Sequence, residues 1–168
     1  MLKFIIAILA LTLPASAYAK YFEPYEATNT LRIPPGDILI ETKKHRLIFA
    51  IDEELVVIYP VAVGREGMAW SGEAEVGRMV EGPAWHPTEA QRKRKKLPVR
   101  VAPGPNNPLG SHALYLFDGG RDTLFRIHGT NAPASIGKSV SDGCIRMRND
   151  HIEVLYEMVD IGANVIVR

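Results

Sequence analysis

The chain has 168 residues, with 20 Lys and Arg against 19 Asp and Glu, and it contains a single Cys. This near-neutral balance gives no general reason to expect a nucleic acid or an anionic membrane as a partner. The length suits one domain with an ordinary core.

The N-terminus predicts a secretory signal. Lys3 precedes an apolar run from Phe4 to Leu13, and small residues follow up to Ala19, which is the order of a cleaved leader. The run is shorter than the roughly twenty residues of a membrane-spanning helix. We expect cleavage after Ala19, or else after Ala17, and an exported protein of the periplasm or cell envelope with no transmembrane helix. A buried N-terminal helix is the alternative.

After a polar leader over residues 20–36, the remaining chain, 37–168, is predicted to be one mainly β domain. Apolar runs at Ile38–Glu41, Arg46–Ile51 and Leu55–Val63 are separated by charged turns, which indicates an antiparallel meander. Further strands are expected at Val76–Val80, Ala113–Phe117, Thr123–Ile127, Cys144–Met147 and Val165–Val167.

A Pro-rich, basic segment at 81–110 is predicted to form a flap. It holds six of the twelve prolines, and a connection of this length in a compact domain is usually functional or disordered. Thr88 and Gln91 could cap a short helix that includes the five basic residues 92–96. Those residues form either a solvated face or an anion site, and Trp85 either packs under the loop or braces a substrate.

One C-terminal helix is well marked. Asp150 and Glu153 resemble a capping box, and Gly162 supplies a stop. Between them an apolar stripe recurs at helical spacing and is expected to enter the core: Ile152, Leu155, Tyr156 and Val159.

The lone Cys144 is the main candidate for chemistry. In an exported protein an odd cysteine suggests a reactive thiol or an intermolecular bond, whereas a buried small hydrophobe is the alternative. His128 lies sixteen residues earlier, and a histidine can take the proton of a thiol and so activate it. The other histidines show no metal-binding spacing, so no metal site is expected.

The residues around this pair suit acyl transfer. Gly143 leaves room for a substrate beside the sulfur, and the backbone N–H groups of Gly143 and Cys144 could stabilise an oxyanion. If the chain is extended after Cys144, Arg146 points the same way. It would then bind a substrate carboxylate or form an internal salt bridge with a helix acid.

The segment "RIHGTN…SIGKSVSDGCIRM" resembles the signature of the L,D-transpeptidases of the YkuD type. Sequences flanking it resemble the same family, from about Ile38 to Val167. The resemblance implies a β-sandwich-like fold of mixed sheets with one packed C-terminal helix. It also implies an enzyme that acts on peptidoglycan stem peptides as donor and acceptor, without a cofactor. We expect it to be a monomer.

By residue, the resemblance implies Cys144 as the nucleophile and His128 as its base. Gly129, Ser141, Gly143 and Arg146 match the rest of the signature and are candidates for oxyanion or substrate binding. Cys144 would attack the carbonyl of the diamino acid at position three, release D-alanine and pass the acyl group to an amine, which gives a 3→3 cross-link.

Two positions depart from the family pattern. Asp142 stands where many members have His, and a carboxylate beside a thiolate raises the pKa of the thiol. We therefore expect its carboxylate to turn away from sulfur, toward His128 or solvent. Glu75 stands at the usual proline position of another family segment, so we assign it no binding role.

Other functions remain open. Water as acceptor would make the protein an L,D-carboxypeptidase, a protein lysine an anchoring enzyme, and a free D-amino acid an exchange enzyme. A silent wall-binding domain is the alternative of another class, although it would need neither His128 nor Cys144. A papain-like protease fits worse, because there the cysteine precedes its histidine.

Overall fold

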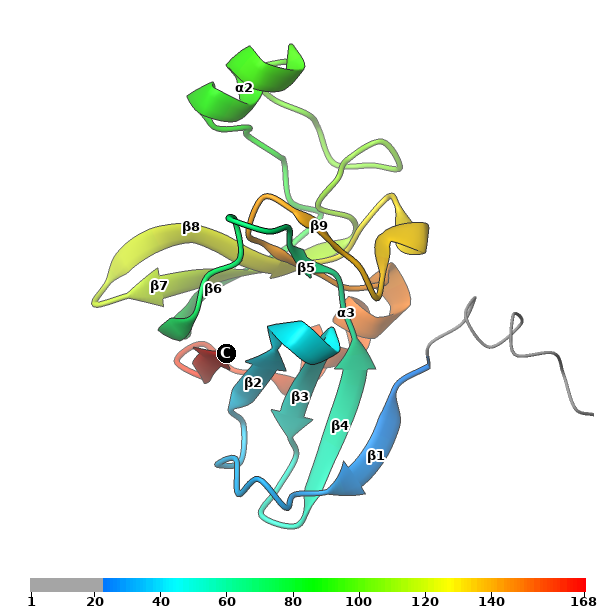
Figure 1. Ribbon diagram of the computed structural model, residues 1–168, viewed down its shortest axis with the longest axis vertical. Helices are drawn as coiled ribbons and strands as arrows, with labels where there is room; N and C mark the ends of the chain where they lie inside the picture. Colours follow the sequence, from blue (N-terminus) through cyan, green and yellow to red (C-terminus); the bar gives the residue numbers. More distant parts are fainter. Residues whose placement is uncertain (1–22) are drawn as a thin grey trace, which may run out of the picture.

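The computed structural model describes residues 23–168 (Figure 1), so the expected signal peptide lies outside the described residues. Its strands are β1 (Tyr25–Thr28), β2 (Ile38–Glu41), β3 (Arg46–Ala50), β4 (Leu55–Pro60), β5 (Val63–Gly64), β6 (Gly72–Glu81), β7 (His112–Asp118), β8 (Arg121–His128), β9 (Ser139–Ser141), β10 (Ile145–Arg146) and β11 (Asn164–Val167). The helices are α2 (Glu89–Lys95), α3 (Asn149–Met158) and two 3₁₀ turns, η1 (Thr42–Lys44) and η2 (Pro133–Ser135). Within residues 23–168 no helix has the length and apolar character needed to cross a membrane.

Nine strands form one mixed sheet in the order β1-β4-β3-β2-β11-β6-β7-β8-β10, while β5 and β9 pair separately. The antiparallel meander β2-β3-β4 is confirmed, as is the mainly β fold with a packed C-terminal helix. Strand β1 lies in the segment predicted as a polar leader, where it pairs with β4. Its polar, largely exposed residues carry no apolar run, so the sequence pattern does not reveal it.

The curvature of the sheet encloses one main core. Both halves of the sheet contribute fully buried side chains to it, together with α3: Ile40, Leu47, Tyr59, Leu114, Ile127, Ile152 and Leu155. A second cluster covers the outer face of β2-β3-β4 and includes Ile33, from the predicted leader, with Ile48 and Ile58. Strand β3 is therefore buried on both faces, which explains its continuous apolar run.

The two helices begin differently from one another. Thr88 and Gln91 form the expected capping box at the start of α2. The capping box expected at Asp150 is wrong: the N-cap of α3 is Arg148, and it makes no side-chain cap bond. Asp150 lies in the first turn instead, where a carboxylate still interacts favourably with the helix dipole.

The flap leaves the sheet after β6 and returns at β7, carrying α2 beyond the sheet (Figure 1). It is anchored at its base by Asn107, whose side chain is fully buried and binds the carbonyl oxygens of Pro83 and Ala102. The isolated bridge between Trp85 and Val101 holds the two arms together. The flap thus has a fixed base, and its tip is free of the main core.

Candidate active site

The structure brings His128 and Cys144 to the same place through the parallel pairing of β8 and β10. In this register Ile145 is opposite Ile127 and Arg146 is opposite His128. Cys144 precedes the strand by one residue and faces the same side as Arg146, because side chains alternate along an extended chain. Cys144, His128 and Arg146 all line one cavity of about 390 Å³.

The environment of His128 keeps its imidazole neutral. Burial lowers the pKa of His128 to about 4, the Gly129 carbonyl acts in the opposite direction, and the nearby charge of Arg146 lowers it further. Nδ1 lies 2.5 Å from the Gly129 carbonyl oxygen. A carbonyl only accepts, so we assign the proton to Nδ1, which leaves Nε2 unprotonated. The Leu109 backbone also interacts with the ring and favours its protonated form. Such an imidazole can accept a proton at neutral pH.

Cys144 is a free cysteine and is only partly exposed. Its sulfur is surrounded by protein but opens to cavities, and its Sγ lies 3.9 Å from the Leu124 carbonyl oxygen. Burial raises the pKa of the Cys144 thiol, the backbone and charge of Arg126 and the charge of Arg146 lower it, and the charge of Asp142 raises it. The thiol and the imidazole that line this cavity are therefore both neutral at rest.

Ser141 and Gly143 shape the turn that presents the thiol. The buried Ser141 hydroxyl donates to the Cys144 carbonyl oxygen at 2.6 Å and accepts from the Gly143 N–H at 3.0 Å. Gly143 has φ +118°, and a Cβ there would lie 2.6 Å from the Phe125 ring. Because the Ser141 hydroxyl already accepts from the Gly143 N–H, we expect the N–H of Cys144, rather than that of Gly143, to be the oxyanion donor.

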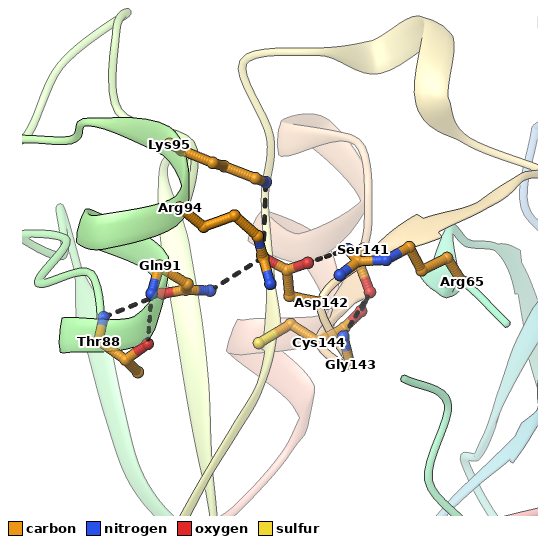
Figure 2. Close-up of polar contacts among 9 residues, drawn as sticks. All are labelled: Arg65, Thr88, Gln91, Arg94, Lys95, Ser141, Asp142, Gly143 and Cys144. Atoms are coloured by element: carbon orange, nitrogen blue, oxygen red, sulfur yellow. Dashed lines mark hydrogen bonds and ion pairs between the residues drawn. The ribbon is translucent and has the colours of Figure 1, made fainter. Parts of the chain in front are cut away.

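Asp142 does not behave as expected (Figure 2). Its carboxylate contacts neither His128 nor bulk solvent, since its side chain is only 13% exposed. Instead it accepts from side chains on two sides of the turn: Arg65 on one, and Gln91, Arg94 and Lys95 of the flap on the other. The expectation that the carboxylate turns toward His128 or solvent is wrong. Long basic side chains from distant segments of the chain form ion pairs with it instead.

The flap divides the space around the thiol into two cavities. The second cavity, of about 530 Å³, lies along β7 and β8 and includes Tyr115 and Arg126. Five residues line both cavities: Trp85, Gln91, Leu109, Asp142 and Cys144. Cys144 is therefore reachable from either side of α2.

Arg146 and Gly129 have different surroundings. Within residues 23–168 the Arg146 side chain makes no hydrogen bond or ion pair, so the internal salt bridge considered for it is not formed there. Gly129 is buried, and a Cβ would lie 2.3 Å from the Asn149 amide oxygen. That oxygen accepts from the Thr130 and Ser111 N–H groups. Asn149 thus fixes the loop after His128, a role that no local sequence signal indicates.

Of the five basic flap residues, Arg94 and Lys95 bind Asp142, and Lys93 pairs with Glu89 at 2.7 Å. Glu75 lies within β6, opposite Asn164 and Phe117 of neighbouring strands, and lines neither cavity at the thiol.

Comparison with known proteins gives a consistent family match. The family model YkuD, the L,D-transpeptidase catalytic domain, matches residues 35–167. The probable L,D-transpeptidase ErfK/SrfK of Escherichia coli strain K12 is 35% identical over 172 residues, which cover 91% of this chain and 53% of that protein. The chain spans about half the length of such curated relatives.

Solved structures also resemble this chain, and two of them illustrate the likeness. A crystal structure of a probable carnitine operon oxidoreductase from Brucella melitensis is 39% identical, with a TM-score of 0.60 over 88% of this chain and 94% of that one. The catalytic domain of an Enterococcus faecium L,D-transpeptidase acylated by ertapenem has a TM-score of 0.60 at 17% identity, over 81% and 98% of the two chains. The second likeness concerns the fold alone. The name of the Brucella protein describes another activity, whereas the family model and the E. coli relative agree.

Proposed function

Because the chain belongs to the L,D-transpeptidase catalytic-domain family, we propose that it is an exported cysteine acyltransferase acting on peptidoglycan stem peptides. The observation that carries the proposal is the shared cavity of Cys144, His128 and Arg146 at the paired ends of β8 and β10. Nucleophilic catalysis by cysteine requires an unpaired thiol and a neutral imidazole that share one site.

The first half-reaction forms a thioester. As the thiol approaches the carbonyl of the diamino acid, Nε2 of His128 takes the Sγ proton and the sulfur forms a bond to the carbonyl carbon. The Cys144 N–H is the backbone donor available for the oxyanion. When the C–N bond to D-alanine breaks, the imidazolium returns the proton to the leaving amine. No net proton is gained or lost.

The second half-reaction reverses these roles. An amine on a second stem peptide attacks the thioester carbon, His128 accepts the amine proton, and the proton returns to the departing thiolate. The new amide is the 3→3 cross-link, and the free thiol is regenerated. The two cavities that meet at Cys144 support a reaction with two peptides, since each could occupy one side of the flap.

Arg146 is proposed to hold a substrate carboxylate. Its guanidinium has no acid partner within residues 23–168 and lines the cavity of the reacting pair. A charge-assisted bidentate contact there would orient the peptide. Ser141 and Gly143 stabilise the turn that presents the thiol, and Asp142 binds side chains of the flap.

Incubation of the protein with purified disaccharide-tetrapeptides, followed by mass analysis, tests this function. Cross-linked dimers together with free D-alanine are the expected products. Tripeptides alone would identify an L,D-carboxypeptidase with the same acyl-enzyme. Unchanged peptides, with the fold intact by circular dichroism, would refute the enzyme and favour a silent wall-binding domain. A Cys144→Ala variant is the matched control.

A further inference from the structure

A row of three side chains crosses the sheet beside the candidate active site. Arg78 of β6 is the cross-strand partner of Tyr115 of β7, and Tyr115 is in turn the partner of Arg126 of β8. The two guanidinium carbons lie 3.8 Å and 4.1 Å from the centre of the Tyr115 ring. Both distances lie within the range of cation–π contacts. The ring therefore holds two guanidinium groups in fixed positions.

The strands are built to keep this register. A bulge between Val76 and Arg78 brings Arg78 opposite Tyr115. The intervening Gly77 lies against the Phe117 ring, where a Cβ would approach within 2.4 Å. A larger residue would push β6 from β7 and disrupt the row. A bulge next to a candidate active site is a common means of directing a side chain.

The two arginines differ in what else they bind. Arg126 is only 12% exposed and forms a two-pronged ion pair with Asp122, at 2.7 Å and 2.8 Å. Arg78 is exposed and stacks on the Tyr115 ring. Its charge contributes to lowering the pKa of Asp122, but within residues 23–168 it forms no hydrogen bond or ion pair. The row thus holds two positive charges and one negative charge. The N–H groups of Arg78 are the ones left for a ligand.

Arg78 also lies at a cavity that contains the thiol. Arg78, Tyr115, Arg126 and Cys144 all line the 530 Å³ cavity. The acid that shares this cavity, Asp142, is already bound by Arg65 and Arg94. A stacked guanidinium with free N–H groups is suited to a carboxylate, which it can bind in a bidentate manner.

We propose that Arg78 binds the free side-chain carboxylate of the diamino acid in the donor stem peptide, and so makes the enzyme selective for stems in which that group is not amidated. This inference rests on the proposed function. The diamino acid supplies the carbonyl that Cys144 attacks, so its side chain extends from the reacting centre into the adjoining space. A neutral amide in place of the carboxylate would lose the charge-assisted contact.

Turnover of two matched donors tests the assignment. One is the disaccharide-tetrapeptide with the free side-chain carboxylate, and the other is the same peptide amidated at that group. We expect the wild type to release D-alanine from the free acid with a kcat/KM about 10- to 100-fold higher, the range of one hydrogen bond to a charged group. Arg78→Gln should lose this preference by slowing the free acid alone.

The control variant is Arg121→Gln, since Arg121 is exposed on β8 and lines neither cavity at the thiol. It should keep the wild-type preference. If Arg78→Gln retains the preference, or slows both donors equally, Arg78 only supports Tyr115 and the inference is wrong.

A binding experiment separates this inference from the proposed function. It measures equilibrium binding of the same two peptides to a Cys144→Ser variant, with and without Arg78→Gln. Preferential binding of the free acid that depends on Arg78, without D-alanine release by the wild type, would refute the proposed reaction and leave the carboxylate site standing. D-alanine release without any preference would refute the site alone. Absence of both binding and release would refute both.

Discussion

The carboxylate of Asp142 links the turn before Cys144 to the flap, and Asp142→Asn is the substitution that tests this link. Asparagine keeps the shape of the side chain and removes its charge. The ion pairs with Arg65, Arg94 and Lys95 would be lost, although neutral hydrogen bonds could persist. We expect the protein to fold, to be less stable, and to hold its flap more loosely.

The pKa of Asp142 gives the size of the effect. Burial raises this pKa, but hydrogen bonds from Arg65 and Gln91 and the charge of Lys95 outweigh it and lower it from 3.8 to about 2. At 1.36 kcal/mol per pKa unit, the difference corresponds to about 2 kcal/mol of folding free energy. Arg94 and Lys95 are about half exposed, so solvent screening reduces the expected loss to about 1–2 kcal/mol.

The sign of the pH dependence follows from the lowered pKa. A carboxyl whose pKa falls on folding stabilises the native state above its unfolded value, here 3.8, and loses that effect as the pH drops toward about 2. The stability difference between wild type and Asp142→Asn should therefore be complete at pH 6. It should fall to roughly half at pH 3, because the unfolded carboxyl is then mostly protonated.

Urea unfolding at pH 6 and pH 3 measures this difference. Asp118→Asn is the matched control, because Asp118 is exposed and makes no side-chain ion pair within residues 23–168; its stability should match that of the wild type at both pH values. A loss below about 0.3 kcal/mol at pH 6, or an equal loss at both pH values, would refute the electrostatic account of Asp142.

The same variant should change the reactivity of the thiol. The charge of Asp142 raises the pKa of Cys144, after the larger effect of burial, so its removal should lower that pKa and speed alkylation by iodoacetamide at pH 7. The double variant Arg94→Gln/Lys95→Gln keeps the anion and loosens the flap. If both variants accelerate alkylation without a change in the pKa of the thiol, the rate is controlled by access of iodoacetamide to the sulfur and not by the charge of Asp142.

His128→Asn should slow acylation by ~10²–10⁴-fold without a collapse in thermal stability; a large loss of stability with normal activity would make His128 structural. Burial lowers the pKa of His128 to about 4, so the acylation rate should hold down to about pH 5 and fall as the imidazole is protonated near pH 4. A carbapenem should form a covalent adduct on Cys144, which peptide mapping would locate. An adduct on a serine would contradict the mechanism. Gly143→Ala should destabilise the protein by about 1–3 kcal/mol in thermal unfolding, because its Cβ would meet Phe125 at φ +118°; unchanged stability would disprove the strain.

Local patterns in the sequence were enough to locate several helices and strands. The alternating apolar runs located β2, β3 and β4, the capping pair Thr88 and Gln91 located α2, and helical spacing located the buried face of α3. The spacing of His128 and Cys144 likewise pointed to a shared site. These features depend on side chains that are close in sequence, so their patterns survive without knowledge of the fold.

Features that depend on contacts between distant segments could not be predicted and became visible in the folded chain. Asp142 binds Arg65, 77 residues away, and Arg94, 48 residues away, whereas its neighbours in sequence suggested His128 or solvent. The row from Arg78 to Arg126 exists because two register shifts, one between β6 and β7 and one between β7 and β8, align the three strands. A long charged side chain can pair with many different partners. The fold of the sheet determines which of these partners lie close enough to bind.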